Sequence, residues 1–242
     1  MKFLRKTIFL VAGLTLTMSF TGCITSEKEE GSSMTFSTLQ WKMKQAKSYS
    51  EFDCYVMTQK TSENTLIKSY YLRPDYAKSE TYKDSKLKSV LIFNKDRIWN
   101  INVKTQRPEE ILGINREKIH IFENLNKPES YDKIFSKINI SEKKIKDKWY
   151  YELTCQPKVA EISTVWIYVN RETFRLEIIK TFNNNIEFKQ FITSYKDFEG
   201  IKIPDKIKIV QGLESYEIEL VDFNKDIKLT PSDFTPKKPW YE

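Results

Sequence analysis

The chain has 242 residues, 40% of them hydrophobic and 30% charged, which is typical of a globular protein with one large domain or two small ones. Six glycines are too few to favour a nucleotide-binding α/β architecture, whose phosphate loops consume glycine. The net charge of +7 falls to +4 when the three charges of the first 22 residues are set aside, and the chain has no concentrated basic stripe of the kind that binds nucleic acid.

Residues 1–22 have the organisation of a signal peptide. Three basic residues precede an apolar run at 8–20, which is shorter than the ~20 apolar residues of a membrane-spanning helix. The run ends in Thr21 and Gly22 before Cys23, which resembles a bacterial lipobox. We expect diacylglyceryl transfer to the Cys23 thiol, and two acyl chains give stable anchoring at the extracytoplasmic face of the cell membrane. An ordinary secretory signal and an uncleaved anchor are the alternatives.

The segment after the predicted cleavage site is polar, charged and rich in small residues, so 23–35 is expected to be a flexible tether. Residues 36–47 follow as a short amphipathic helix. The period then changes to two, which predicts strands that begin near Phe52 and continue at 65–73, 76–83, 86–93 and 96–103. Short polar turns separate these strands and predict an antiparallel meander.

The middle of the chain interrupts the strand pattern. Pro108 and the two glutamates after it predict a helix start, and 119–137 predicts one or two short helices around Pro128. Strands resume at 138–146, 148–156, 162–169, 173–182, 185–195, 201–210 and 214–223. The proline-containing tail from Lys228 is expected to lie extended on the surface.

These elements predict one mainly β domain over 36–242. About eleven hairpin-connected strands would form a single curved antiparallel sheet, an open and incomplete β-barrel, with short helices covering its concave side. Two segments, 90–93 and 165–169, are apolar on both strand phases. Such strands suit a sheet that is partly covered on both faces or an apolar cavity.

Five motifs, in this order and spacing, resemble the Lol-type lipoprotein carrier and receptor superfamily over about 48–236. They are Leu72–Lys78, Val90–Ile101, Tyr168–Phe174, Gly200–Asp205 and Pro231–Pro236. The resemblance implies an open β-barrel with a helical lid over an apolar cavity that holds acyl chains. Together with the lipobox, the resemblance predicts a membrane-anchored, non-catalytic protein that binds an acyl lipid or a lipoprotein.

Clostridial spore germination lipoproteins resemble the same fold, and the lysine- and isoleucine-rich, glycine-poor composition suits an AT-rich genome of that kind. This second resemblance implies a protein-interaction adaptor that binds and activates a cell-wall amidase, the spore cortex amidase of germination. The lipobox argues against a diffusing shuttle and for the adaptor, whereas the doubly apolar strands argue for a cavity.

The sequence contains no catalytic or metal-binding motif: there is no nucleophile elbow, phosphate loop, HExxH or CxxC. The single histidine, His120, has no cluster of cysteines or carboxylates at ligand spacing, so a structural role is expected. We therefore expect no enzymatic activity, no metal and no cofactor.

Two further groups of residues are candidates for a site. Cys54 and Cys155 remain after lipidation of Cys23, and an extracytoplasmic pair permits a disulfide, although their apolar strand phase equally suits two buried thiols. The candidate lining of an acyl cavity is apolar and aromatic, with plain core packing as the alternative; it comprises Trp99, Ile101, Tyr151, Trp166 and Tyr168.

Overall fold

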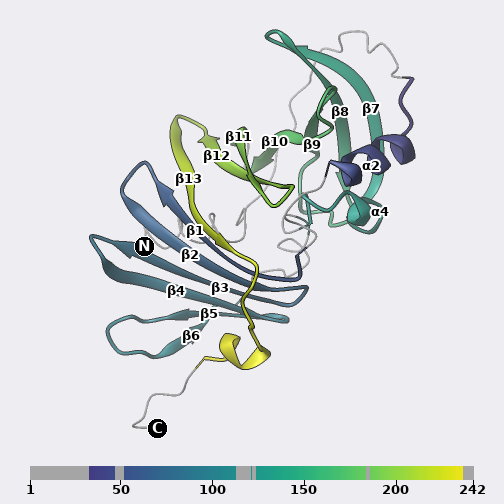
Figure 1. The fold of residues 1–242 in the computed structure, drawn as a ribbon. Helices are drawn as coiled ribbons and strands as arrows, with labels where there is room; N and C mark the ends of the chain where they lie inside the picture. The colour runs from purple at the N-terminus through teal and green to yellow at the C-terminus, as the bar shows by residue number, and fades with distance from the viewer. Residues whose placement is uncertain (1–32, 47–51, 113–120, 122–123, 184–185, 237–242) are drawn as a thin grey trace. The chain divides into compact units, whose positions relative to one another are not determined.

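The computed structural model describes residues 33–46, 52–112, 121, 124–183 and 186–236 (Figure 1). The predictions for Cys23 and His120 lie outside the described residues. The chain divides into two compact units. Unit 1 contains the described parts of 51–116 and 216–242, and unit 2 those of 16–50 and 117–215.

The described residues form a mainly β fold, as predicted. Its strands make one antiparallel sheet of thirteen strands, more than the eleven expected, in the order β6-β5-β4-β3-β2-β1-β13-β12-β11-β10-β9-β8-β7. The order begins at β6 and ends at β7, so the sheet is not closed into a barrel. Hairpins join most neighbours, because the short turns seen in the sequence allow only antiparallel pairing.

Unit 1 is a meander of six strands joined at its β1 edge by the last strand of the chain. Its elements are β1 (Cys54–Thr61), β2 (Thr65–Leu72), β3 (Tyr76–Lys83), β4 (Lys86–Asn94), β5 (Arg97–Ile101), β6 (Pro108–Glu110), β13 (Glu214–Asn224) and the 3-10 helix η3 (Pro231–Phe234). The β3–β4 turn places both Asp84 and Ser85 at positive φ, as a tight two-residue hairpin turn requires.

Unit 2 combines three short helical segments with six strands. Its elements are α2 (Phe36–Gln45), η2 (Pro128–Ser130), α4 (Tyr131–Ile134), β7 (Phe135–Ile145), β8 (Lys148–Pro157), β9 (Val165–Asn170), β10 (Leu176–Asn183), β11 (Ile186–Phe198) and β12 (Ile201–Gln211). The Thr35 side chain caps α2 by accepting from the Thr38 amide at 3.3 Å. The helix expected at 36–47 is thus confirmed, and a short helical segment follows Pro128 as expected.

Helix α2 packs on the sheet of unit 2 near β7 to β9 (Figure 1). Leu39 is fully buried and Met43 nearly so, four residues apart on the same side of the helix. They enter one core cluster with Leu153 and Ile167 of the sheet. Gln40 ties the helix to η2 by donating to the Pro128 carbonyl at 2.8 Å. A helix therefore covers one face of the unit 2 sheet.

Pro108 begins a strand and not the predicted helix. Asn100 pairs with Glu109 and Trp99 with Glu110, so β6 extends the sheet as its edge strand. Arg97 holds Glu110 through two hydrogen bonds, from Nε at 3.0 Å and from Nη2 at 2.5 Å. A proline is tolerated at the first residue of an edge strand, and pairing with β5 overrides the local helix-start signal.

The C-terminal tail is not simply extended on the surface as predicted. Pro231–Phe234 forms η3, and the Phe234 side chain is fully buried. Its ring lies 5.7 Å from the ring of Tyr76, and Asn94 donates to its carbonyl at 3.3 Å. Burial of one aromatic side chain, together with a capping box between Thr230 and Asp233, fixes a segment that its prolines suggested would be extended.

Candidate ligand-binding surface

Alternation along the strands of unit 1 separates two faces of its sheet. The register places Leu91 opposite Ser79 on β3 and opposite Asn100 on β5, and we call their side the Leu91 face. The opposite side carries Glu80, and we call it the Glu80 face. Because side chains alternate with a period of two, each strand contributes to both faces.

The Leu91 face is mostly apolar and buried. Seven of its large apolar side chains are 8% exposed or less: Tyr55, Met57, Ile67, Leu91, Phe93, Ile98 and Phe223. By contrast, β3 contributes only small residues to this face: Ala77, Ser79 and Thr81. The central strand therefore adds little side-chain volume to this face, and only Ala77 lies between large neighbours on both sides, Tyr71 and Phe93.

Four polar atoms on the Leu91 face are buried and have no hydrogen bond partner among the described residues. They are Ser79 Oγ, Thr81 Oγ1, Ser89 Oγ and Asn100 Oδ1. Thr81 and Ser89 lie directly opposite each other, and Leu91 separates Ser79 from Asn100 across three strands. Buried polar groups are nearly always satisfied in proteins, so these four atoms call for partners beyond the described residues, such as ordered water or a ligand.

The polar side chains of the Glu80 face bind one another. The Glu80 carboxylate accepts from Tyr70 Oη at 3.0 Å and from Tyr82 Oη at 2.9 Å, and it pairs with Lys78 Nζ at 3.2 Å. Burial and the neighbouring carboxylate raise the pKa of Tyr82 to about 12 and raise the pKa of Tyr70 as well. This face also receives η3, so its polar groups are paired with each other and with the tail.

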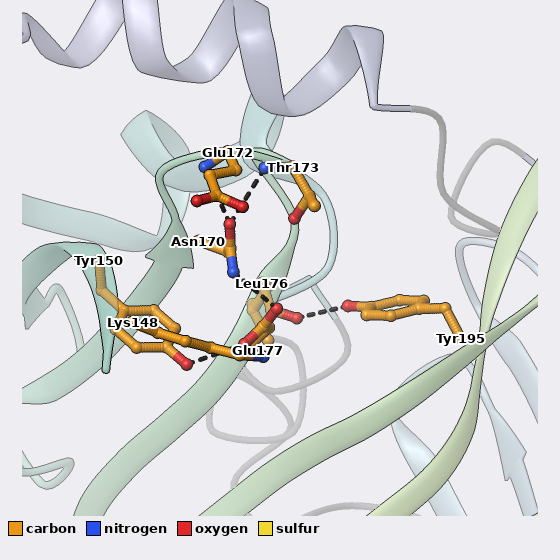
Figure 2. A network of polar contacts seen from close by, with 8 residues as sticks. All are labelled: Lys148, Tyr150, Asn170, Glu172, Thr173, Leu176, Glu177 and Tyr195. Carbon is orange, nitrogen blue, oxygen red and sulfur yellow. Dashed lines mark hydrogen bonds and ion pairs between the residues drawn. The ribbon is translucent and has the colours of Figure 1, made fainter. Parts of the chain in front are cut away.

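A second polar cluster, in unit 2, surrounds Glu177 (Figure 2). The Glu177 carboxylate accepts from Tyr150 Oη at 2.9 Å and from Asn170 Nδ2 at 2.9 Å, and it lies 3.4 Å from Lys148 Nζ. Asn170 in turn caps the β9–β10 turn, accepting from the amides of Glu172 and Thr173. Burial, and then the hydrogen bond to Glu177, raise the pKa of Tyr150. The cluster ties three strands and a turn, which is a structural role.

The candidate cavity residues fall in both units and on different faces. In unit 1, Trp99 and Ile101 are half-buried on the Glu80 face, opposite Ile92 and Val90. In unit 2, Tyr151 belongs to the core cluster beneath α2.

The other two candidates, Trp166 and Tyr168, lie on the opposite face of the unit 2 sheet from Tyr151. There Tyr168 packs with Tyr150 and Ile178, with Trp166 beside them. The structure therefore places Trp99 and Ile101 together on β5, and Trp166 and Tyr168 together on β9. It does not bring the five candidates together as the lining of one cavity.

Sequence reasoning singled out 90–93 as doubly apolar but did not single out the polar residues of the Leu91 face. Ser69, Ser79, Thr81 and Ser89 occupy the phase that Ile67 and Leu91 also occupy, which a period-of-two pattern marks as the buried side. The signal available in the sequence was the presence of small hydroxyl-bearing residues at alternate strand positions that are otherwise apolar. Their convergence depends on strand register, which the sequence does not show.

Cys54 and Cys155 are both free thiols in the structure. Cys54 belongs to unit 1, where its Sγ donates to the Ile227 carbonyl at 3.2 Å. Cys155 belongs to the unit 2 core with no exposed surface, and burial raises the pKa of its thiol.

In the described residues, no helix is long and apolar enough to cross a membrane. The same residues contain no group of three or more histidine, cysteine, aspartate or glutamate side chains that could hold a metal ion.

No protein-family model and no curated protein sequence matches the chain. Solved structures do match. A LolA superfamily protein from Nitrosomonas europaea is 11% identical with a TM-score of 0.60, over 84% of this chain and 98% of its own. A DUF1329 family protein from Desulfovibrio piger is 13% identical with a TM-score of 0.60, over 83% and 95%.

A third structure carries the description outer membrane lipoprotein-sorting protein domain and comes from Vibrio parahaemolyticus. It is 11% identical with a TM-score of 0.57, over 81% of this chain and 94% of its own. At such identities the likeness concerns the fold, and it agrees with the predicted resemblance. This chain has a Lol-like fold.

Proposed function

We propose that this chain is an extracytoplasmic lipoprotein, anchored through diacylglyceryl on Cys23, that binds an acyl chain without catalysis. The observation that carries the proposal is the Leu91 face, an apolar surface crossed by a strand of small residues, on a Lol-like sheet. Acyl chains bind through apolar contact, and ~0.8 kcal/mol is gained for each methylene group removed from water.

The lipobox supports the anchored form of this function. Two acyl chains on Cys23 and the polar segment at 24–35 would hold the domain close to the membrane, within reach of lipids and lipoproteins there. Replacement of Cys23 by Ser should release the protein from the membrane fraction, and labelled palmitate should be incorporated into the parent protein only. Equal labelling of both proteins would contradict anchoring through Cys23.

Acyl binding is tested on the mature lipoprotein purified from its own membranes in mild detergent. Native mass spectrometry should show adducts of acyl-lipid mass in addition to the anchor. Ala77→Phe fills the Leu91 face above β3 and should remove the adduct, whereas Lys78→Phe places the same ring on the Glu80 face and should retain it. Should Ala77→Phe fail to fold, Ala77→Val serves as the milder variant.

The same measurement separates the two functions that the sequence leaves open. A stoichiometric protein with no lipid adduct would overturn the acyl-binding proposal and support an adaptor, for example one that binds a cell-wall amidase. Adducts that persist in Ala77→Phe but not in Lys78→Phe would move the binding surface away from the Leu91 face.

A further inference from the structure

The four unpartnered polar atoms of the Leu91 face are distributed over three adjacent strands. Ser79 and Thr81 are on β3, Ser89 is on β4 and Asn100 is on β5. Ser79 is completely buried, Thr81 is 2% exposed and Ser89 is 4% exposed. Neighbouring strands are ~4.8 Å apart, so these groups extend over ~10 Å, about the size of a glycerol ester.

Each of these groups has a defined hydrogen-bonding capacity. The hydroxyls of Ser79, Thr81 and Ser89 can donate to a carbonyl oxygen, and the Asn100 Oδ1 atom can only accept. A plain hydrocarbon chain would leave all four without partners. A ligand that satisfies them needs carbonyl oxygens and at least one hydroxyl or amide hydrogen.

Apolar side chains lie next to the four unpartnered polar atoms. Leu91 lies between Ser79 and Asn100, and Ile67 lies opposite Thr81 on the other side. The polar atoms are therefore enclosed by the same apolar side chains that would contact an acyl chain. Two other buried hydroxyls are paired: Thr181 in unit 2 donates to the Thr164 carbonyl at 3.2 Å, and Thr61 in unit 1 accepts from the Thr65 amide.

We propose that Ser79, Thr81, Ser89 and Asn100 form a polar subsite that binds the ester and hydroxyl groups of an acylglycerol. This inference rests on the proposed function, because it names the ligand class of the same face. The hydroxyls donate to the carbonyl and ester oxygens of the ligand, and Asn100 Oδ1 accepts from a glycerol hydroxyl. The acyl chain lies against the apolar side chains of the Leu91 face.

Competition between two esters of the same acyl chain tests the subsite. An environment-sensitive apolar dye bound to the purified mature lipoprotein is displaced with 1-monopalmitoylglycerol or with methyl palmitate, which lacks hydroxyl groups. The parent protein should prefer monopalmitoylglycerol by about tenfold, the effect of one buried acceptor left without a partner. Asn100→Leu should abolish that preference.

The hydroxyl groups are tested by a triple variant, Ser79→Ala with Thr81→Val and Ser89→Ala. It should weaken the binding of both esters by a similar factor, because both carry the carbonyl. Thr181→Val removes a paired, fully buried hydroxyl in unit 2 and should change neither affinity.

Equal affinity of the parent protein for both esters would overturn the subsite and leave acyl binding intact, with ordered water as the partner of the four atoms. A preference that survives in Asn100→Leu would also overturn it. If neither ester displaces the dye, or if the dye does not bind saturably, the proposed function itself fails.

Discussion

Thr81 and Ser89 lie directly opposite each other on β3 and β4, and neither hydroxyl has a hydrogen bond partner among the described residues. Leaving a buried hydroxyl unpaired costs ~1–3 kcal/mol. We therefore expect Thr81→Val, which keeps the shape of the side chain, to stabilise the ligand-free protein by ~1 kcal/mol in urea unfolding.

Thr61 provides the matched control for this substitution. It is also buried, but its hydroxyl accepts from the Thr65 amide at 3.3 Å. Thr61→Val should therefore destabilise the protein by ~1 kcal/mol. If Thr81→Val is destabilising to the same extent, the Thr81 hydroxyl has a partner, such as a bound water.

Adjacent tyrosines on β8 allow the Glu177 cluster to be tested. Tyr150 donates to the Glu177 carboxylate at 2.9 Å (Figure 2). The neighbouring Tyr151 belongs to the core cluster on the opposite face. Tyr150→Phe should lower the free energy of unfolding by ~1.5 kcal/mol, the value of a hydrogen bond to a charged group. Tyr151→Phe keeps the ring in the core and should have little effect. Similar losses in both variants would contradict this assignment.

We expect the stability of the protein to depend on the buried side chains of helix α2. Leu39 is fully buried, so Leu39→Ala should cost ~2–5 kcal/mol through lost contacts and a residual cavity. Trp41 is 62% exposed, and Trp41→Ala should change the stability by less than ~0.5 kcal/mol. Thermal unfolding followed by circular dichroism checks both values. A large effect of Trp41→Ala would show that this tryptophan has a partner.

The tyrosines around Glu80 predict a loss of stability at alkaline pH. Their folded-state pKa values lie above the value of ~10 in the unfolded chain, and that of Tyr82 is about 12. The unfolded state therefore loses its protons first, and the contribution of these groups is complete below pH ~10 and disappears as pH rises towards about 12. Urea midpoints measured from pH ~9 to ~12 should fall.

Glu80→Gln should reduce the steepness of that fall, because it removes the negative charge that opposes ionisation of Tyr70 and Tyr82 while leaving their burial. Glu80→Gln and the parent protein are compared over the same pH range, so that the effect of lysine titration, which is common to both, cancels. Identical pH dependence in both would contradict the role of Glu80.

The oxidation state of Cys54 and Cys155 is tested by thiol labelling of the mature lipoprotein without reductant. Two thiols should react after denaturation, since Cys54 and Cys155 are both free. In the native protein, Cys54 should react faster, because Cys155 is fully buried and burial raises its pKa. No labelling after denaturation, with two thiols appearing on reduction, would establish the disulfide that the sequence permits.

The strands and α2 could be predicted from sequence because the period of apolar residues is a local property. β3 was expected at 76–83 and occupies those residues, and β2 and β4 differ from prediction by one residue at one end. β6 and η3 could not be predicted, since both depend on partners outside their own segments. Glu110 is held by Arg97, and Phe234 packs on Tyr76. Such contacts override the helix-start and proline signals within each segment.

By itself, the sequence determined that the chain is mainly β, that its strands are joined by hairpins and that it resembles a Lol-type protein. Alternation, turn residues and motif order suffice for these conclusions. Only the tertiary structure decided that Ser79, Thr81, Ser89 and Asn100 share one buried face without partners among the described residues. The reason is physical: strand register sets which side chains meet across a sheet, and register depends on pairing between strands, which no single segment encodes.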